Sequence, residues 1–318
     1  MSFGNLLLIT MRLSVITVNY NNRDGLHRTI DSVIDQTLRD FEWIVIDGGS
    51  TDGSRELVEQ HQDAITYWCS EPDKGIYHAM NKGIAIARGE YCLFLNSGDR
   101  LHDKNVISCV LPLLDGTDFI SGDEWHVDAN YSYFKTNENP NIITDYHMLV
   151  GILWHQCTFI RTQLLKEHPY DESLKIAADW EEMFYELVIN KKSYKHINLI
   201  VSDFVVGGAS ENDWDLLCKE RKQVRDMYLS QRQQDEMALE YHDKKGGPSS
   251  KCYMAEIAYT AFANNYYSER DYLELFAPYR TIIIRNSTIY HRVVNFICIS
   301  GYMHMAKSIY KFMRIFVR

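Results

Sequence analysis

The segment Phe41-Glu42-Trp43-Ile44-Val45-Ile46-Asp47-Gly48-Gly49-Ser50-Thr51-Asp52-Gly53 decides the fold class of this 318-residue chain. Its aromatic and β-branched half predicts a buried strand, and its glycine-rich half predicts the turn that ends the strand. A second such run ends in Phe94-Leu95-Asn96-Ser97-Gly98-Asp99. Because ligands of open α/β sheets bind at the carboxyl ends of the strands, we expect these acids to line a crevice for an anionic, nucleotide-like ligand.

Strand and helix signals alternate through the first two thirds of the chain. Apolar runs predict strands at residues 13–18, 41–46, 65–69, 91–95, 119–127, 131–135, 156–160 and 196–206. Helical spacing and start signals predict helices after Asn22, from Ser50 or Thr51 to Gln60, and at residues 76–87, 105–114, 162–167 and 179–189. Strands separated by helices pair in parallel through right-handed crossovers. The expected fold class is therefore α/β, with a mostly parallel twisted sheet and flanking helices.

The end of the chain differs in composition from the rest. Helical spacing dominates from Asp213 onward, and Gly246-Gly247-Pro248-Ser249-Ser250 reads as a linker. The chain carries 43 acidic and 33 basic residues, a net charge of -10, which argues against a nucleic-acid partner. No Asp or Glu follows Glu274, so the last segment is basic.

Cysteine usage and the first residues favour a cytoplasmic protein. The seven cysteines are odd in number and never spaced as Cys-x-x-Cys, so neither a disulfide framework nor a zinc cluster is indicated. The apolar run at residues 6–9 is too short for a signal-peptide core. Met11 follows it directly and is an alternative start to Met1.

Four motifs, in this order and spacing, resemble the family 2 glycosyltransferases, which have a GT-A fold. They are Val15-Ile16-Thr17-Val18-Asn19-Tyr20-Asn21, Ile46-Asp47-Gly48-Gly49-Ser50-Thr51-Asp52-Gly53, Asn81-Lys82-Gly83 with Ala87-Arg88-Gly89-Glu90-Tyr91, and Leu95-Asn96-Ser97-Gly98-Asp99. A thinner resemblance continues through His155-Gln156 and Ala178-Asp179-Trp180-Glu181 and stops near Ser210. It implies a GT-A domain at 12–210, with a nucleotide-sugar half (12–100) and an acceptor half (101–210), before a helical region (211–318).

The resemblance implies a nucleotide site at the first strand ends. Asp47 would accept a hydrogen bond from the nucleobase, and a carboxylate, which only accepts, suits the imide N–H of uracil or thymine. Thr17, Asn19 and Tyr20 would hold the same base or its ribose. The alternatives are that Asp47 only begins a turn and that Tyr20 only packs at a strand end.

Lys74 follows a Pro-Asp break, and its ammonium group is expected to reach a phosphate or the ribose. A solvated loop lysine is an equal alternative. Gly83, inside the following helix, is expected to permit close packing rather than to bind a ligand.

Asn96-Ser97-Gly98-Asp99 stands where the family has an Asp-x-Asp motif that holds a divalent cation between two phosphates. Mg²⁺ and Mn²⁺ need oxygen ligands and take few of them from protein, so Asp99 alone could serve as the metal ligand. Asn96 and Gly98 replace common carboxylates, which lowers the local charge. We expect Asn96 to contact the nucleotide; a simple turn between strand and helix is the alternative.

Asp179 stands where the family has its catalytic base, which takes the proton of the acceptor hydroxyl. Helix starts favour carboxylates, so the alternative is a simple helix cap, and Glu181 or Glu182 could take the role instead. His155 is the candidate for the acceptor pocket.

Four cations of the last segment recur at helical spacing and form a basic stripe. They are Lys307, Lys311, Arg314 and Arg318. Apolar residues such as Phe312 and Phe316 fall on the opposite side. This division predicts a helix that binds an anionic membrane surface, and no run is long enough to span one. The alternative is a helix that packs on its own domain.

The resulting hypothesis is an inverting glycosyltransferase that uses a nucleoside diphosphate sugar, most simply a UDP-sugar. Its acceptor would be a hydroxyl of a lipid-linked or oligosaccharide substrate in cell-surface polysaccharide synthesis, reached from the inner face of the membrane. Two alternatives remain open: a non-catalytic sugar-nucleotide binding module and a sugar-phosphate nucleotidyltransferase. The second lacks the Gly-rich, basic phosphate loop expected after its first strand.

Overall fold

The computed structural model describes residues 11–127, 132–135, 145–151, 153–205, 213–286 and 299. The chain divides into two compact units, Met1–Val224 and Arg225–Arg318. The domain boundary predicted near residue 210 falls among residues 206–212, outside the described ranges.

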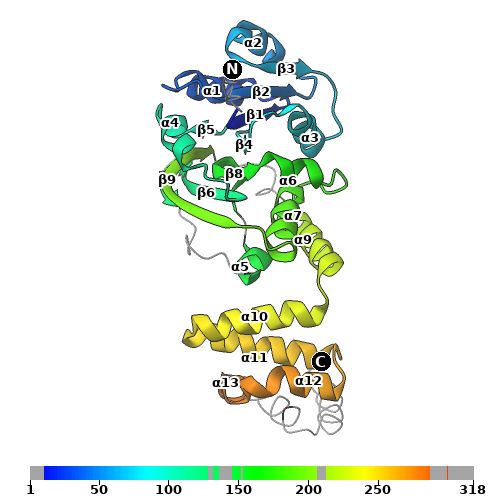
Figure 1. Ribbon diagram of the computed structural model, residues 1–318. Helices are drawn as coiled ribbons and strands as arrows, with labels where there is room; N and C mark the ends of the chain where they lie inside the picture. The colour runs from blue at the N-terminus through cyan, green and yellow to red at the C-terminus, as the bar shows by residue number, and fades with distance from the viewer. Residues whose placement is uncertain are drawn as a thin grey trace, which may run out of the picture. The chain divides into compact units, whose positions relative to one another are not determined.

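The first unit is built on one mixed, curled sheet (Figure 1). Its strands are β1 (Leu13–Asn19), β2 (Glu42–Asp47), β3 (Tyr67–Ser70), β4 (Tyr91–Phe94), β5 (Arg100–Leu101), β6 (Phe119–Val127), β7 (Ser132–Lys135), β8 (Thr158–Arg161) and β9 (Tyr194–Val205). They lie in the order β3-β2-β1-β4-β8-β6-β9-β5, with β7 beside β6. Strands β1 to β4 are parallel, whereas β8 runs antiparallel to both β4 and β6. The predicted strands all form, and the parallel pairing holds in the first half.

Helices alternate with the strands along the described part of this unit. They are α1 (Arg23–Ile34), α2 (Ser54–Gln60), α3 (Ile76–Ile86), α4 (Val106–Val110), α5 (Asp145–Val150), α6 (Thr162–Glu167), α7 (Ala178–Phe184) and, across the unit boundary, α9 (Trp214–Tyr228). The side chain of Asn22 starts α1 by accepting a hydrogen bond from the Gly25 N–H. The helix expected from Ser50 or Thr51 begins later, at Ser54, after Gly53 in the left-handed region (φ 91°), and Asp52 accepts from the Ser54 N–H. The helix expected at 179–189 is α7 followed by a π-helical turn, Tyr185–Ile189.

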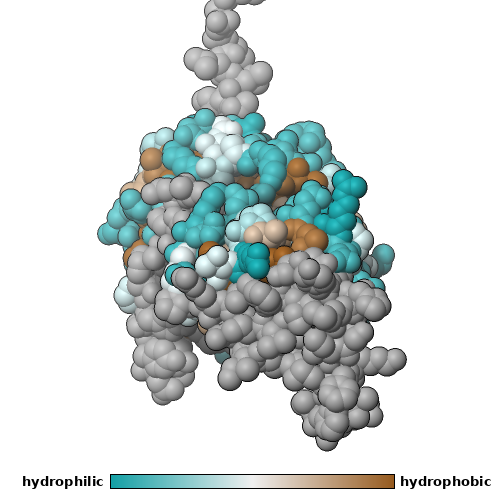
Figure 2. Space-filling model, turned by 90° about the horizontal axis from the view of Figure 1, so that it is seen from below, coloured by the Kyte–Doolittle hydropathy of each residue, from teal (hydrophilic) through white to brown (hydrophobic). Residues whose placement is uncertain are grey.

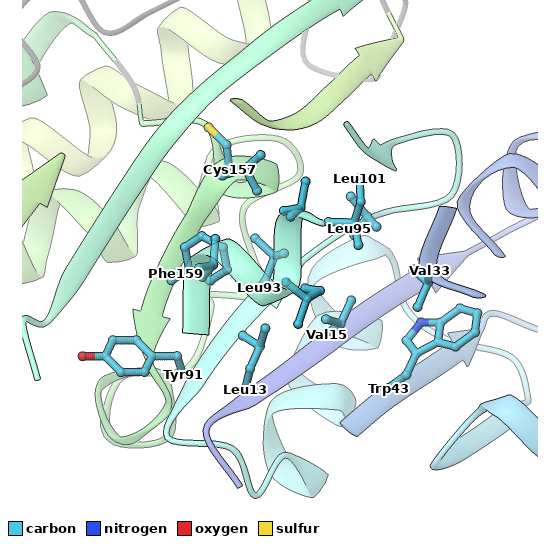
Figure 3. Packing of buried hydrophobic residues seen from close by; sticks show 14 of the residues in the cluster. Leu13, Val15, Val33, Trp43, Tyr91, Leu93, Leu95, Leu101, Cys157 and Phe159 are labelled. Atoms are coloured by element: carbon cyan, nitrogen blue, oxygen red, sulfur yellow. The ribbon is translucent and has the colours of Figure 1, made fainter. Parts of the chain in front are cut away.

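Alternating residues of β1 face opposite sides of the sheet. Leu13 and Val15 join the main hydrophobic cluster, together with Leu93 of β4 and Phe159 of β8 (Figure 3). Full burial of each such side chain contributes about 1.5–3 kcal/mol. On the other face, α3 lies so close that a Cβ atom on Gly83 would meet Ile16 Cγ2 at 2.6 Å. The packing role predicted for Gly83 is therefore confirmed.

A buried carboxylate joins the amino ends of β1, β2 and β4. Glu42 is 1% exposed and accepts hydrogen bonds from the Ser14 hydroxyl at 2.5 Å and the Gly89 N–H at 2.9 Å. Burial alone would raise the pKa of Glu42, but these bonds and those from Arg88 lower it. The Ala87-Arg88-Gly89-Glu90 motif therefore anchors the sheet at the edge opposite the strand carboxyl ends.

The second unit is helical. Its helices are α10 (Gln231–Lys245), α11 (Gly247–Ala263), α12 (Glu269–Phe276) and α13 (Arg280–Asn286). They enclose a core that includes Leu239, Met254, Phe262, Tyr272 and Phe276. The linker predicted at residues 246–250 is wrong, since α11 begins at Gly247 and the two helices meet in a tight turn at Gly246.

Among the coloured residues of Figure 2, hydrophilic ones dominate and hydrophobic ones form small groups between them. Among the described residues, no helix has both the length and the apolar character needed to cross a bilayer. The basic stripe Lys307 to Arg318 lies outside the described residues, so its helix stays a prediction.

Candidate active site

The last rungs of β1, β2 and β3 place three polar side chains in a row. Asn19 pairs with Asp47 in the strand register, and Asp47 pairs with Ser70. The Asp47 carboxylate accepts from Asn19 Nδ2 (2.7 Å) and Ser70 Oγ (2.6 Å), and also from the hydroxyl (2.5 Å) and N–H (2.9 Å) of Ser50. Burial raises its pKa, but these four bonds outweigh burial and lower it. Asp47 is ionised and fastens the strand ends to the following turn.

A cavity of about 910 Å³ opens over these strand ends. One part is lined by residues that follow β1, β2 and β3: Tyr20, Gly48, Gly49, Pro72 and Asp73. Another part is lined by the loop after β4 and by the second half of the sheet: Asn96, Ser97, Gly98, Asp99, His155 and Asp179. The predicted strand-end crevice is therefore present, and it joins both halves of the sheet.

Two cavity-lining groups come from the loops after β2 and β3. Gly48 has no side chain, and the Asp73 carboxylate lies over it: a Cβ atom on Gly48 would be 2.5 Å from Asp73 Oδ2. The Tyr20 ring borders the same place, with Cδ2 3.1 Å from that position, and its side chain is 66% exposed. The sequence analysis predicted a ligand contact for Lys74 but none for Asp73, the residue directly before it.

Asp179 is held by two donors from distant parts of the chain. The Tyr77 hydroxyl donates to its Oδ1 at 2.9 Å, and His155 Nδ1 lies 3.0 Å from its Oδ2. Burial would raise the pKa of Asp179, but the bond and charge of His155, and the bond from Tyr77, lower it. The carboxylate is therefore ionised and oriented at the cavity wall, as a general base requires. Tyr77 is a site residue that the sequence reasoning missed.

The two neighbouring acids of α7 are placed differently. Glu181 is turned to His168, whose Nε2 lies 3.1 Å from Glu181 Oε1. Glu182 is fully buried, and burial raises its pKa well above the ordinary value. Neither residue is among those that line the cavity. The geometry thus favours Asp179 over both alternatives.

Asp99 and Asn96 border the cavity from the loop after β4. Asp99 is 7% exposed, and its burial raises its pKa to about 7, although His155 opposes the rise. The Asn96 amide nitrogen lies 3.1 Å from His155 Nε2, and its Oδ1 is buried without a hydrogen-bond partner in the described structure. His155 therefore bridges the loop after β4 to the acid of α7.

Asp99 and Asn96 are oxygen donors of the kind that a divalent cation needs. Among the described residues, no three or more His, Cys, Asp or Glu side chains gather into a complete metal site. One carboxylate (Asp99) and one unpartnered amide oxygen (Asn96) fit a hard cation that takes most of its ligands from phosphate and water. The residues suit Mn²⁺ or Mg²⁺ bound together with a diphosphate.

Two predicted nucleotide contacts lie away from the cavity wall. Thr17 is fully buried, and its Oγ1 accepts from the Trp43 indole N–H at 3.1 Å. Its direct contact with a base or ribose is not supported, because it faces the interior of the sheet. Lys74 is exposed and is not among the cavity residues. Of the described lysines and arginines, Arg28 and Lys175 line the cavity, and the sequence reasoning missed both.

Comparison with known proteins places the chain among glycosyltransferases. A family model described as glycosyl transferase family 2 matches residues 14–178. An uncharacterized glycosyltransferase of Mycobacterium tuberculosis is 37% identical over 174 residues, 53% of this chain and 66% of that protein. A PGL/p-HBAD biosynthesis glycosyltransferase of Mycobacterium bovis is 26% identical over 175 residues, with the same coverage. The chain thus spans just under two thirds of the length of these curated relatives.

The predicted fold is confirmed by solved structures. The crystal structure of S. aureus TarS 1-349 matches with a TM-score of 0.56 at 17% identity, covering 95% of this chain and 92% of that one. The same S. aureus protein is known in complex with UDP-GlcNAc, which matches with a TM-score of 0.53 at 16% identity. At this level of identity the likeness concerns the GT-A fold alone.

Proposed function

Because the chain belongs to the family 2 glycosyltransferases, we propose that it transfers a sugar from a UDP-sugar to a hydroxyl of a lipid-linked or oligosaccharide acceptor. The acceptor would be an intermediate of cell-surface polysaccharide synthesis, used at the inner face of the membrane. The TarS complexes with UDP and UDP-GlcNAc support a uridine nucleotide as the donor.

One observation carries this proposal: an ionised, oriented carboxylate lines the same cavity as the carboxyl ends of the parallel strands. Asp179 lines the cavity together with Tyr20 and Asp99, and its oxygens are fixed by Tyr77 and His155. A fixed carboxylate can take the proton of an acceptor hydroxyl as the oxygen attacks the anomeric carbon. Direct attack inverts that carbon and requires no nucleophile on the enzyme.

Other cavity residues would serve the donor. Asn19 and Tyr20 line the cavity and would border the nucleoside, and Asp47 holds Asn19 by accepting a hydrogen bond from its side chain. Asp99 and Asn96 would hold a divalent cation, Mn²⁺ or Mg²⁺, whose charge stabilises a departing diphosphate. Arg28 and Lys175 line the same cavity and add positive charge. His155 would fix Asp179 and border the acceptor.

A donor screen tests the proposal. The purified protein is incubated with Mn²⁺ and a panel of UDP-, dTDP-, GDP-, CDP- and ADP-sugars, and nucleotide release is measured. We expect slow hydrolysis of at least one UDP-sugar, lost in the Asp179→Asn variant. Binding of UDP-sugars with no hydrolysis and no transfer to any acceptor would favour the non-catalytic binding module, and a nucleotidyltransferase would instead release pyrophosphate from UTP and a sugar phosphate.

A further inference from the structure

The nucleobase end of the cavity has a carboxylate other than the one predicted from the sequence. Asp47 is completely buried, and each of its oxygens accepts two hydrogen bonds from protein groups. It is not among the residues that line the cavity. A base could reach Asp47 only by displacing Asn19, Ser50 or Ser70, and the loss of a buried charged hydrogen bond is costly.

Among the described residues, three acids do line the cavity: Asp73, Asp99 and Asp179. Asp99 and Asp179 belong to the part around His155, since both interact with that imidazole. Asp73 stands apart from them, beside the exposed ring of Tyr20 and over Gly48. It is the carboxylate at the end of the cavity formed by β1, β2 and β3.

The space that Asp73 occupies exists because residue 48 is glycine. A Cβ atom on Gly48 would come within 2.5 Å of Asp73 Oδ2, a distance that real Cβ contacts do not show. Asp73 Oδ1 accepts from the Gly75 N–H at 3.0 Å, which orients the carboxylate. Within the described residues no group donates to Oδ2, so this oxygen is available to a ligand.

Building on the function proposed above, we propose that Asp73 reads the nucleobase of the donor. Its Oδ2 accepts the imide N3–H of uracil, the Tyr20 ring lies against the base, and Gly48 keeps the place open. Asp47 then acts as a positioning residue that holds Asn19 and the Ser50 turn. Thymine, with the same imide, would be accepted in the same way.

This arrangement discriminates between bases of equal size. Uracil presents an N–H donor at N3, whereas cytosine presents a lone pair there. An ionised carboxylate has only acceptor sites, so it attracts the first and repels the second. An asparagine in the same place could turn its NH₂ group toward cytosine, which would reverse part of the selection.

The test measures UDP and CDP affinity by calorimetry, with Mn²⁺ present, for the unmodified protein and two variants. We expect Asp73→Ala to weaken UDP binding about tenfold or more, the usual effect of losing a hydrogen bond to a charged group. Asp73→Asn should narrow the ratio of UDP to CDP affinity, which a merely structural role would not do. Glu71→Gln is the matched control, because Glu71 is an exposed acid of the same loop that pairs with Lys82. The ratio of UDP to CDP affinity should stay unchanged in this variant.

A double-mutant cycle tests the role of the glycine. Gly48→Ala must displace the Asp73 carboxylate and should weaken UDP binding in the unmodified background. In the Asp73→Ala background the same change should have a smaller effect, because the carboxylate is gone and only the Tyr20 ring, 3.1 Å from the new Cβ atom, must still give way. Thermal unfolding of each variant separates lost affinity from lost fold.

The outcomes distinguish the two proposals. If the unmodified protein binds UDP but Asp73→Ala binds it equally well, or the UDP to CDP ratio is unchanged in Asp73→Asn, the assignment of Asp73 is overturned and the donor function stands. If the unmodified protein binds no uridine nucleotide, the donor function fails and the assignment falls with it. Additive effects of Gly48→Ala and Asp73→Ala also contradict the assignment.

Discussion

The imidazole of His155 lies 3.0 Å from the carboxylate of Asp179, although the two residues belong to different elements. Each residue shifts the pKa of the other. Asp179 raises the pKa of His155 against the effect of burial, and His155 lowers the pKa of Asp179. Together with the Tyr77 hydroxyl, which donates to the other oxygen, this contact fixes the orientation of the Asp179 carboxylate. Because His155 also meets Asn96, a change at the loop after β4 can reach the proposed base through one ring.

Replacement of the proposed base should separate chemistry from binding. Asp179→Asn keeps the shape but removes the proton acceptor, so transfer should fall about a hundredfold or more while UDP affinity changes little. Steady-state rates and calorimetry measure the two effects. Glu182→Gln on the same helix is the control and should retain transfer. If Asp179→Asn keeps its rate within tenfold, Glu181 or Glu182 becomes the candidate.

Removal of the proposed cation ligand should weaken donor binding itself. In Asp99→Ala the cavity loses a carboxylate, so UDP affinity with Mn²⁺ should approach the value that the unmodified protein shows in EDTA. Calorimetry with and without EDTA makes the comparison. A variant that still gains UDP affinity from Mn²⁺ would show that the cation is held elsewhere.

Thr17 should matter for stability and not for the nucleotide. Thr17→Val leaves the Trp43 indole N–H buried without its acceptor, which costs about 1–3 kcal/mol of unfolding free energy. Urea unfolding measures the loss, and UDP affinity should stay the same. Thr17→Ser, which retains the hydroxyl, is the matched control. A fall in UDP affinity without a fall in stability would restore Thr17 as a ligand contact.

His168 should make stability depend on pH. Its hydrogen bond to Glu181 raises its pKa above 6.5, against the effect of burial. The charged form is thus favoured in the folded state, so the stabilisation is complete below about pH 6.5 and is lost as pH rises through the raised pKa. His168→Gln should therefore remove stability at pH 6 and less at pH 9. Urea midpoints at the two values provide the check; an equal loss at both would contradict the assignment.

The basic stripe near the end of the chain remains a prediction from the sequence. Its four cations should attach the protein to anionic vesicles, since each basic group near such a surface contributes roughly 1 kcal/mol. Flotation should therefore succeed with anionic liposomes, fail with neutral ones and weaken with salt. Replacing Lys307, Lys311, Arg314 and Arg318 by glutamine should abolish it. Equal flotation of both forms, or none at low salt, would favour a helix packed on its own domain.

The sequence was sufficient for features that depend on local patterns. The strand from Glu42 to Asp47, the turn after it and the cap at Asn22 all follow from neighbouring residues. The surroundings of Asp47 could not be predicted in the same way, because Ser70 reaches it from another strand. Asp73 was missed for a related reason. Its carboxylate lies where a side chain of residue 48 would begin, and this contact arises only when the loops after β2 and β3 meet in the fold.

The second half of the sheet was the least predictable part. Its strands were expected from their composition, but the insertion of β8 between β4 and β6 depends on pairing between distant segments. The same insertion brings His155 beside Asp179. Residues such as Tyr77, whose hydroxyl meets Asp179 across 102 positions of sequence, carry no local signal of a site.

The position of β8 also has a consequence for synthesis on the ribosome. Strands β1 to β4 emerge first and can pair with one another, but the free edge of β4 must wait for Thr158–Arg161 before it is covered. During this interval the nascent chain presents an unpaired, apolar strand edge, the kind of surface on which partly folded chains associate. Substitutions that weaken the pairing of β8 with β4 should therefore lower the yield of folded protein, because they prolong the exposure of this edge.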